Sequence, residues 1–282
     1  IMLPDIFKTP WIDSPFFYEI LKRKKKNSFQ KKVAIEMHEQ GYSIINLGIS
    51  NKIIDKLNRD IKSLVISKNY KTNPKYYHYN KSPRIVEAWK YSKNVSMLAK
   101  NKKILYLLKF LFDSKPIPFS TINFIKGTEQ PLHSDYIHFG SIPERYLVGV
   151  WVALENINLR NGPLYVLPKS HKMPLIRSID LKLKKPTNIT QLKNNNSKYE
   201  KIIKDFIKKN NLKTKKIIMK KGQAIIWSAN LLHGGYKMKD IEKTRLSQVT
   251  HYHFKNCKFY YNPSFSEYIK NNYAKRKLEI IK

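Results

Sequence analysis

The sequence contains a single cysteine, Cys257, among its 282 residues. One cysteine excludes a disulfide bond within the chain, and it also excludes a metal site built from several thiolates. Any metal ion that this chain binds must therefore be held by histidine, aspartate and glutamate side chains. Eight histidines and 20 acidic residues are available for that purpose.

Long apolar segments are also absent. No run approaches the roughly 18 consecutive apolar residues that a membrane-spanning helix needs. The first residues lack a charged segment followed by an apolar stretch and a cleavage site, which a secretory signal would show. We therefore expect a cytoplasmic protein without a membrane span. Hydrophobic residues nevertheless make up 41% of the chain, enough for a sizeable core.

Arginine is scarce in a chain that is otherwise strongly basic. The net charge is +35, yet only eight of the 55 basic residues are arginine. Proteins that read bases or phosphates specifically rely on arginine, whose planar guanidinium forms paired hydrogen bonds. We therefore expect no specific nucleic-acid partner. The charge is interpreted as a compositional bias toward lysine, with non-specific attraction to polyanions at low salt.

The expected elements are helices first and strands afterwards. Apolar residues at helical spacing indicate helices over 28–40, from 50 or 51 onward, and over 84–92, 96–112 and 198–209. Short β-branched segments indicate strands over 42–47, 117–125, 146–154, 164–167, 216–219, 223–227 and 246–254. Because strands and helices do not alternate, we predict an antiparallel sandwich or jelly roll, mainly β, supported by N-terminal α-helices.

We expect one domain over residues 1–282. Residues 1–114 are expected to form a mainly helical support, 115–255 the jelly-roll core, and 256–282 a C-terminal extension. The core contains an insert over 175–212 that is rich in lysine and asparagine. A long insert between strands often forms a lid or a mobile loop.

A histidine and an aspartate stand two residues apart in the stretch from Gln130 to His138. If this stretch is extended, the side chains of His133 and Asp135 point to the same face. One more histidine would complete a site of two imidazoles and one carboxylate, which suits non-haem iron and leaves coordination positions open. His233 is the candidate, because it follows an expected strand and precedes two glycines that allow close backbone approach.

Arg245 and Ser247 begin the last expected strand and share one face of it. An arginine that points into a core is unfavourable unless it meets an anion. Its guanidinium pairs well with a carboxylate, and a neighbouring hydroxyl adds a further hydrogen bond. The two residues therefore suit the distal end of a dicarboxylate.

In this order and spacing, the motifs resemble the phytanoyl-CoA dioxygenase family of Fe(II)- and 2-oxoglutarate-dependent oxygenases. The resemblance extends over residues 33 to 254 and includes the blocks 37–42, 151–154 and 161–171. It implies a double-stranded β-helix, a jelly-roll core of the cupin kind. It also implies that His133, Asp135 and His233 bind iron and that Arg245 and Ser247 bind 2-oxoglutarate.

The cofactors implied by this resemblance are Fe(II), 2-oxoglutarate as cosubstrate and O2. We therefore predict a dioxygenase that hydroxylates a small or medium organic substrate, with release of succinate and CO2. In related halogenases a small residue replaces the aspartate and leaves room for chloride, so Asp135 favours hydroxylation. No catalytic residue is expected beyond the metal site, and the expected partner is the small-molecule substrate.

Two alternatives stay open at the level of the sequence. One is a non-catalytic binding protein on the same fold that uses its basic surface. The other is a metal-dependent hydrolase or isomerase built on the same three ligands. Arg245 and Ser247 argue against a hydrolase, because hydrolysis needs no receptor for a dicarboxylate.

Candidate substrate contacts flank the predicted metal ligands. They are Gln130, Tyr136 and His138, with a surface role for Gln130 and a structural role for His138 left open. A polar excursion over 67–83 with four tyrosines is expected to lie at the surface, where it could line a substrate mouth. His78 lies in this excursion and is given no role.

The remaining histidines and two tryptophans are interpreted as structural. His171 is expected to serve a turn and its packing, because no carboxylate stands two residues away. His251 and His253 alternate on the same face as Arg245, so they could line the cavity or fill the floor of the barrel, and the floor is the expected place. Trp151 and Trp227 are interpreted as core aromatics.

Overall fold

The structure is a computed structural model, and it describes residues 9–67, 84–177, 180–266 and 272–282. Nearly all of the polar excursion expected over 67–83, including His78, lies outside the described residues. Within them, no helix combines the length and the apolar character needed to cross a lipid bilayer.

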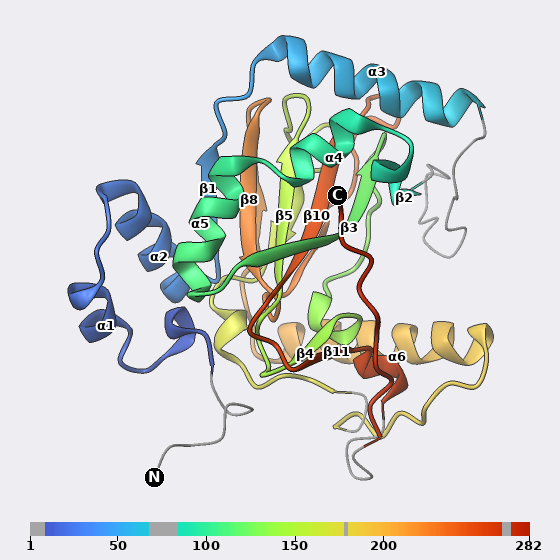
Figure 1. The fold of residues 1–282 in the computed structure, drawn as a ribbon. Coiled ribbons are helices and arrows are strands. Elements are labelled where there is room, and N and C mark those ends of the chain that lie inside the picture. Colours follow the sequence, from blue (N-terminus) through green and yellow to red (C-terminus); the bar gives the residue numbers. More distant parts are fainter. Residues whose placement is uncertain (1–8, 68–83, 178–179, 267–271) are drawn as a thin grey trace.

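Six antiparallel strands form the main sheet, in the order β1, β8, β5, β10, β3, β2 (Figure 1). Their bounds are β1 Tyr42–Asn46, β2 Arg84–Val86, β3 Pro116–Phe124, β5 Val148–Ala153, β8 Gln223–Ser228 and β10 Ser247–Phe254. β5 occupies an inner position, with β8 and β10 on either side. Its residues are apolar throughout and all buried, because alternate side chains pack on the two layers beside the sheet: Val150 in the cluster with the helices and Trp151 in the cluster with the three-stranded sheet.

Two smaller sheets complete the β structure. One contains β7 (Lys215–Ile217), β6 (Leu164–Val166) and β9 (His233–Gly235), and the other contains β4 (Gly140–Ile142) and β11 (Phe259–Tyr261). The strands of both sheets pair antiparallel. Trp151 of the main sheet shares an apolar cluster with Leu164 of the three-stranded sheet, so these two sheets pack face to face. The predicted jelly-roll class is confirmed.

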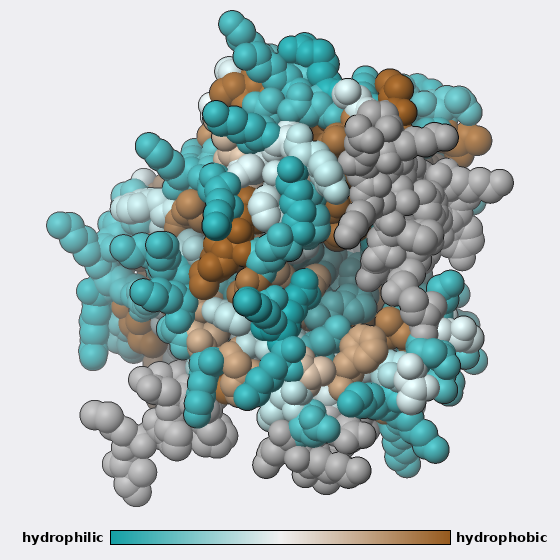
Figure 2. Space-filling view, turned by 45° about the vertical axis from the view of Figure 1, so that its right-hand side comes forward, coloured by the Kyte–Doolittle hydropathy of each residue, from teal (hydrophilic) through white to brown (hydrophobic). Residues whose placement is uncertain are grey.

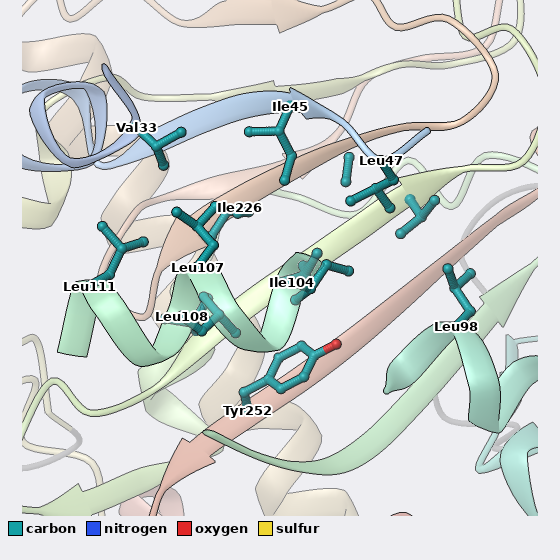
Figure 3. Packing of buried hydrophobic residues seen from close by; sticks show 14 of the residues in the cluster. Val33, Ile45, Leu47, Leu98, Ile104, Leu107, Leu108, Leu111, Ile226 and Tyr252 are labelled. Atoms are coloured by element: carbon teal, nitrogen blue, oxygen red, sulfur yellow. The ribbon is translucent and has the colours of Figure 1, made fainter. Parts of the chain in front are cut away.

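Helices cover the opposite face of the main sheet (Figure 1). Their bounds are α1 Phe17–Arg23, α2 Ser28–Gln40, α3 Asn51–Ser67, α4 Lys93–Ala99 and α5 Lys102–Phe112. A further helix, α6 Ile189–Lys209, lies in the insert and packs elsewhere. Four residues of α5 point toward the sheet (Figure 3), namely Ile104, Leu107, Leu108 and Leu111. They share a cluster with Ile226 of β8 and Tyr252 of β10. Burying such side chains contributes roughly 1.5–3 kcal/mol each, which holds the helical layer on the sheet.

Side-chain caps explain where the helices begin. The Asn27 side chain accepts from Gln30 N at 2.8 Å while the Gln30 side chain accepts from Asn27 N at 3.1 Å, so α2 starts as predicted. Asn101 accepts from Lys103 N at 3.0 Å and starts α5. This cap divides the single helix predicted over 96–112 into α4 and α5.

Other expected boundaries are wrong. The helix predicted over 84–92 is a strand, β2, followed by a short 3-10 turn. Ile85 and Val86 are β-branched, and pairing with β3 outweighs their helical spacing. The insert helix begins at Ile189 instead of Lys198, because Asn188 caps it by accepting from Gln191 N at 3.0 Å. A further helix that was not predicted, α1, precedes α2.

A cavity of about 540 Å³ lies among the sheets, the insert and the C-terminal segment. It is lined by residues of the main sheet such as Trp151 and Val249, by Leu164 of the three-stranded sheet, and by Arg276 near the chain end. The outer surface differs in character: hydrophilic residues cover most of the face shown in Figure 2, with apolar residues in smaller groups.

Candidate metal centre

The backbones of His133 and His233 pair directly with each other. His133 N donates to His233 O at 2.9 Å, and His233 N donates to His133 O at 3.0 Å. Gly234 makes this approach possible, because a Cβ there would stand 2.6 Å from the carbonyl oxygen of Gln130. Two segments far apart in the sequence are thereby held in one register at the cavity.

Both imidazole rings are oriented by backbone carbonyls. His133 Nδ1 lies 2.9 Å from Pro131 O, and His233 Nδ1 lies 3.0 Å from Leu231 O. A carbonyl only accepts, so Nδ1 carries the proton in each ring and Nε2 presents its lone pair. The ring centroids lie 4.6 Å apart, which brings the two lone pairs to one region of the cavity.

Asp135 stands at the start of a 3-10 turn, Asp135–Ile137, so the stretch that contains it is not extended throughout. Ser134 favours the turn, because its Oγ accepts from Tyr136 N at 3.2 Å. The side chains still converge: Asp135 Oδ1 lies 4.0 Å from His133 Nε2 and 3.7 Å from His233 Nε2. One ligand atom from each of these three residues lies within 4.8 Å of the others, so the set could hold one metal ion.

Burial and mutual charge set the protonation of this cluster. His133, Asp135 and His233 have exposed fractions of 8%, 5% and 5%. Burial lowers the pKa of His133 well below 6.5, and His233 lowers it further. Burial alone would raise the pKa of Asp135, but the surrounding histidines, His233 and His251 foremost, hold it below its usual value. Neutral imidazole and ionised carboxylate are the forms that bind a divalent metal.

Two residues contact the other oxygen of Asp135, and the sequence identified neither as part of the site. Trp227 Nε1 donates to Asp135 Oδ2 at 2.7 Å. His251 Nε2 lies 3.3 Å from the same oxygen. The interpretation of Trp227 as a core aromatic is therefore incomplete, and His251, expected on the barrel floor, lines the cavity beside the ligands.

Arg245 lines the same cavity and is 1% exposed. Its Nη1 donates to Gly162 O at 3.2 Å, while its Nε has no hydrogen-bond partner in the described part of the chain. Glu155 raises the pKa of Arg245, but its oxygens accept from Leu246 N and Thr244 Oγ1. Burial, together with the positive charge of Arg84, lowers the pKa of Arg245 to about 9. A buried guanidinium in this state is a receptor for an anion.

Aromatic rings enclose the Arg245 guanidinium. Its Cζ lies 5.3 Å from the centroid of the Phe124 ring and 5.6 Å from that of Trp151. Trp151 belongs to the apolar cluster between the sheets, as predicted, but its buried Nε1 also has no hydrogen-bond partner in the residues described. Arg245 and Trp151 thus present two buried donors on one wall of the cavity.

Arg84 of β2 is a further cavity residue that the sequence did not identify. It is 5% exposed, and its Nη2 donates to Gln130 Oε1 at 2.5 Å. Gln130 Nε2 in turn lies 3.2 Å from His133 Nε2, at the lone pair that a metal would take. Gln130 therefore joins Arg84 to a metal-site residue on the cavity wall, and its predicted contact with the substrate stays a prediction.

Of the remaining predicted site residues, one lines the cavity and two do not. His138 lines the cavity, and burial lowers its pKa to about 4. Tyr136 and Ser247 are not part of the cavity wall. The Tyr136 hydroxyl bonds to Tyr261 Oη at 2.5 Å, and Ser247 Oγ donates to Arg245 O at 3.2 Å. Both residues make supporting contacts within the protein, and their predicted contacts with substrate and cosubstrate stay predictions.

His171 and His253 have structural surroundings. His171 belongs to a 3-10 turn, and its Nε2 lies 2.9 Å from His38 O. His253 Nδ1 lies 3.0 Å from Tyr146 O, and its ring stacks on Phe119. Burial lowers the pKa of His171 to about 4 and that of His253 to about 3. Both agree with the structural roles expected for them.

The insert helix α6 supports the segments that carry the two histidines of the metal site. Tyr199 and Ile203 of α6 share a cluster with Leu132 and Leu232, which precede His133 and His233. The Tyr199 hydroxyl also accepts from Ser134 N at 3.2 Å. Two buried residues thus anchor the insert helix to the site, while most of its other residues are exposed. The role of the insert as a lid or mobile loop stays a prediction.

Solved structures share the fold of this chain. The epimerase SnoN in complex with Fe3+, alpha ketoglutarate and nogalamycin RO gives a TM-score of 0.65 at 13% identity, covering 90% of this chain and 99% of SnoN. EctD from S. alaskensis with bound Fe gives 0.61 at 18% identity, covering 81% and 77%. At these identities the likeness shows the fold. Fold and site together define a jelly-roll protein with a candidate two-histidine, one-carboxylate centre.

The family is shown by the sequence itself. Residues 37–239 match the family model described as Phytanoyl-CoA dioxygenase (PhyH). The chain belongs to this family, as its motifs predicted. The peroxisomal phytanoyl-CoA dioxygenase of Bos taurus is 30% identical over 134 residues, and that of Rattus norvegicus is 28% identical over 134 residues. Each match covers 48% of this chain but only 36% of the mammalian enzyme.

Proposed function

We propose that the chain is an Fe(II)- and 2-oxoglutarate-dependent dioxygenase that hydroxylates a small or medium organic substrate. The observation that carries this proposal is Arg245, a buried guanidinium without an acidic partner among the described residues, on the same cavity as the three converging ligand atoms. A metal site alone would also suit a hydrolase. The receptor for an anion beside it favours a cosubstrate with a free carboxylate.

The donor set fits iron. Two imidazole nitrogens and one carboxylate oxygen converge from His133, His233 and Asp135, and Cys257, the chain's single cysteine, does not line the cavity. A two-histidine, one-carboxylate set that leaves positions open is typical of non-haem Fe(II) oxygenases. When bound, iron, 2-oxoglutarate and O2 supply the oxidising power, with succinate and CO2 as by-products.

The residues of this chain have two tasks in such a reaction. Arg245 binds the distal carboxylate of 2-oxoglutarate, and the unpartnered Nε1 of Trp151 beside it offers a further donor. Apolar side chains such as Phe119, Phe124 and Val249 line the cavity and keep water from the reacting atoms. Gln130 and His138 stand on the cavity wall as candidate contacts with the substrate.

The names of the relatives and structural neighbours indicate which reactions this fold carries out in other proteins. The mammalian relatives are named phytanoyl-CoA dioxygenase, and one structural neighbour is EctD with 2-oxoglutarate and 5-hydroxyectoine. Other neighbours are described as a non-heme alpha ketoglutarate dependent epimerase and a carbocyclase. The fold therefore supports several oxidative outcomes. Asp135 favours hydroxylation over halogenation here, because its carboxylate fills the place that a chloride would need.

Calorimetry with two dicarboxylates tests this proposal. Under anaerobic conditions we expect 2-oxoglutarate to bind the Fe(II)-loaded protein more tightly than the metal-free protein, because its keto acid end chelates the metal. Glutarate is the matched control: it can reach Arg245 but lacks the keto group, so its affinity should be nearly independent of iron. Equal affinity of 2-oxoglutarate with and without iron would refute the proposal.

A further inference from the structure

Resting on the proposed metal site, we infer that Trp227 and Gly149 act together as positioning residues for the metal-binding carboxylate. The indole of Trp227 crosses strand β5 over Gly149 and holds one oxygen of Asp135, so that the other oxygen faces the metal. His251 contacts the same oxygen of Asp135 that the indole binds. The ligand set therefore depends on a row of three residues across the main sheet.

The strand register places these three residues side by side. Trp227 of β8 is paired with Gly149 of β5, and Gly149 is paired in turn with His251 of β10. Residues in register on neighbouring strands point to the same face of a sheet and lie about 5 Å apart. Gly149 has no side chain, so a gap separates the indole from the imidazole in this row.

The indole fills that gap. A Cβ at position 149 would stand 2.3 Å from Cε2 and 2.5 Å from Nε1 of Trp227. The ring therefore lies flat across β5, in space that any other residue at position 149 would occupy. Trp227 is 2% exposed, and its ring centroid lies 4.5 Å from that of His233, so the indole contacts a second ligand as well.

The contacts on Asp135 divide its two oxygens between different tasks. Oδ2 accepts from Trp227 Nε1 at 2.7 Å and lies 3.3 Å from His251 Nε2. Oδ1 faces His133 Nε2 and His233 Nε2 at 4.0 and 3.7 Å. A carboxylate whose Oδ2 is engaged in this way binds a metal through Oδ1 alone, which leaves coordination positions for other ligands. An indole N–H is a neutral donor, so the carboxylate keeps its full negative charge for the metal.

The test uses Co(II) binding to the protein without 2-oxoglutarate, followed by the visible absorption of the ion. Trp227→Phe keeps the ring but removes the donor, and we expect a 10- to 100-fold loss of Co(II) affinity, as for other residues that orient ligands. Gly149→Ala changes neither Trp227 nor any ligand. It should give a comparable loss and the same change in the Co(II) spectrum, because the added methyl displaces the indole.

Val150→Ala is the matched control. Val150 neighbours Gly149 on β5 but points to the helical layer, where it is 1% exposed. We expect this variant to unfold at a lower temperature while its Co(II) affinity and spectrum stay at the wild-type values. If lower folding stability alone reduced the Co(II) affinity, Val150→Ala would lose affinity too. That result would overturn the inference.

The outcomes separate this inference from the proposed function. If Trp227→Phe and Gly149→Ala bind Co(II) within about twofold of the wild type, the positioning role is wrong while the metal site stands. If the wild-type protein itself binds no Co(II), the proposed metal centre fails. Should Trp227→Phe not fold, Gly149→Ala alone decides the matter, since the spectrum of its bound ion reports the position of Asp135.

Discussion

Tyr199 of the insert helix accepts a hydrogen bond from the backbone N–H of Ser134, the residue between two members of the metal site. Tyr199 is 4% exposed and packs with Leu132 and Leu232 on the segments that carry His133 and His233. The insert is therefore part of the support of the site, although nothing in its composition suggests such a role. Removing the hydrogen bond between Tyr199 and Ser134 tests this support most directly.

Tyr199→Phe should destabilise the protein by about 1–3 kcal/mol, because it leaves the buried N–H of Ser134 without its acceptor. Urea unfolding of the metal-free protein measures this change. Tyr106→Phe is the control: Tyr106 lies on α5 and is 64% exposed, so its free energy of unfolding should stay within about 0.5 kcal/mol of the wild type. Equal effects of the two substitutions would mean that the Ser134 contact contributes nothing.

Arg245→Met should separate stability from cosubstrate binding. The buried guanidinium meets no carboxylate in the described residues, so replacing it by an apolar side chain of similar length should leave the melting temperature of the ligand-free protein unchanged or higher. The affinity for 2-oxoglutarate should fall by about 10- to 100-fold, because a charge-assisted pair is lost. Metal affinity should not change. A variant that melts early but binds 2-oxoglutarate normally would show that Arg245 is structural.

Acid should destabilise the metal-free protein through its buried histidines. Burial lowers the pKa of His253 to about 3, whereas the unfolded chain has a value near 6.5. Between these values the unfolded state binds more protons, so stability is complete above pH 6.5 and decreases as the pH falls. His138 and His171, with pKa values lowered to about 4, act in the same direction, while Asp13, raised to about 6, opposes them.

His253→Gln isolates one part of this dependence. From pH 7 to pH 5 the wild-type free energy of unfolding should fall by about 2 kcal/mol more than that of the variant. Urea titrations at the two pH values give this difference, whatever stability the variant has at pH 7. Identical slopes for the two proteins would mean that the pKa of His253 is the same in the folded and the unfolded chain, which would contradict this account.

The convergence of the metal-site residues could be predicted from the sequence, but the local geometry behind it was missed. His133 and Asp135 stand two residues apart, and an extended backbone would align them. In the structure Ser134 caps a turn by accepting from Tyr136 N, so the aspartate reaches the site from a 3-10 turn. Such a side-chain cap is a local signal, and Ser134 before Asp135 is a typical cap sequence.

The residues that the sequence did not identify depend on pairing between distant strands. Trp227 and His251 meet Asp135 only because β8, β5 and β10 are neighbours in one particular register. Spacing along the chain carries no information about that register. Arg84 was not identified as a cavity residue for a different reason. Its segment shows helical spacing but joins the edge of the main sheet as β2.

The central claim is that His133, Asp135 and His233 hold an iron ion to which 2-oxoglutarate binds as a chelate. Anaerobic addition of Fe(II) and 2-oxoglutarate, followed by visible absorption spectroscopy, tests it directly. We predict a weak charge-transfer band that requires both additions, persists with Val150→Ala, and is absent with Asp135→Ala. A wild-type protein that binds Fe(II) but gives no such band with saturating 2-oxoglutarate would contradict the account.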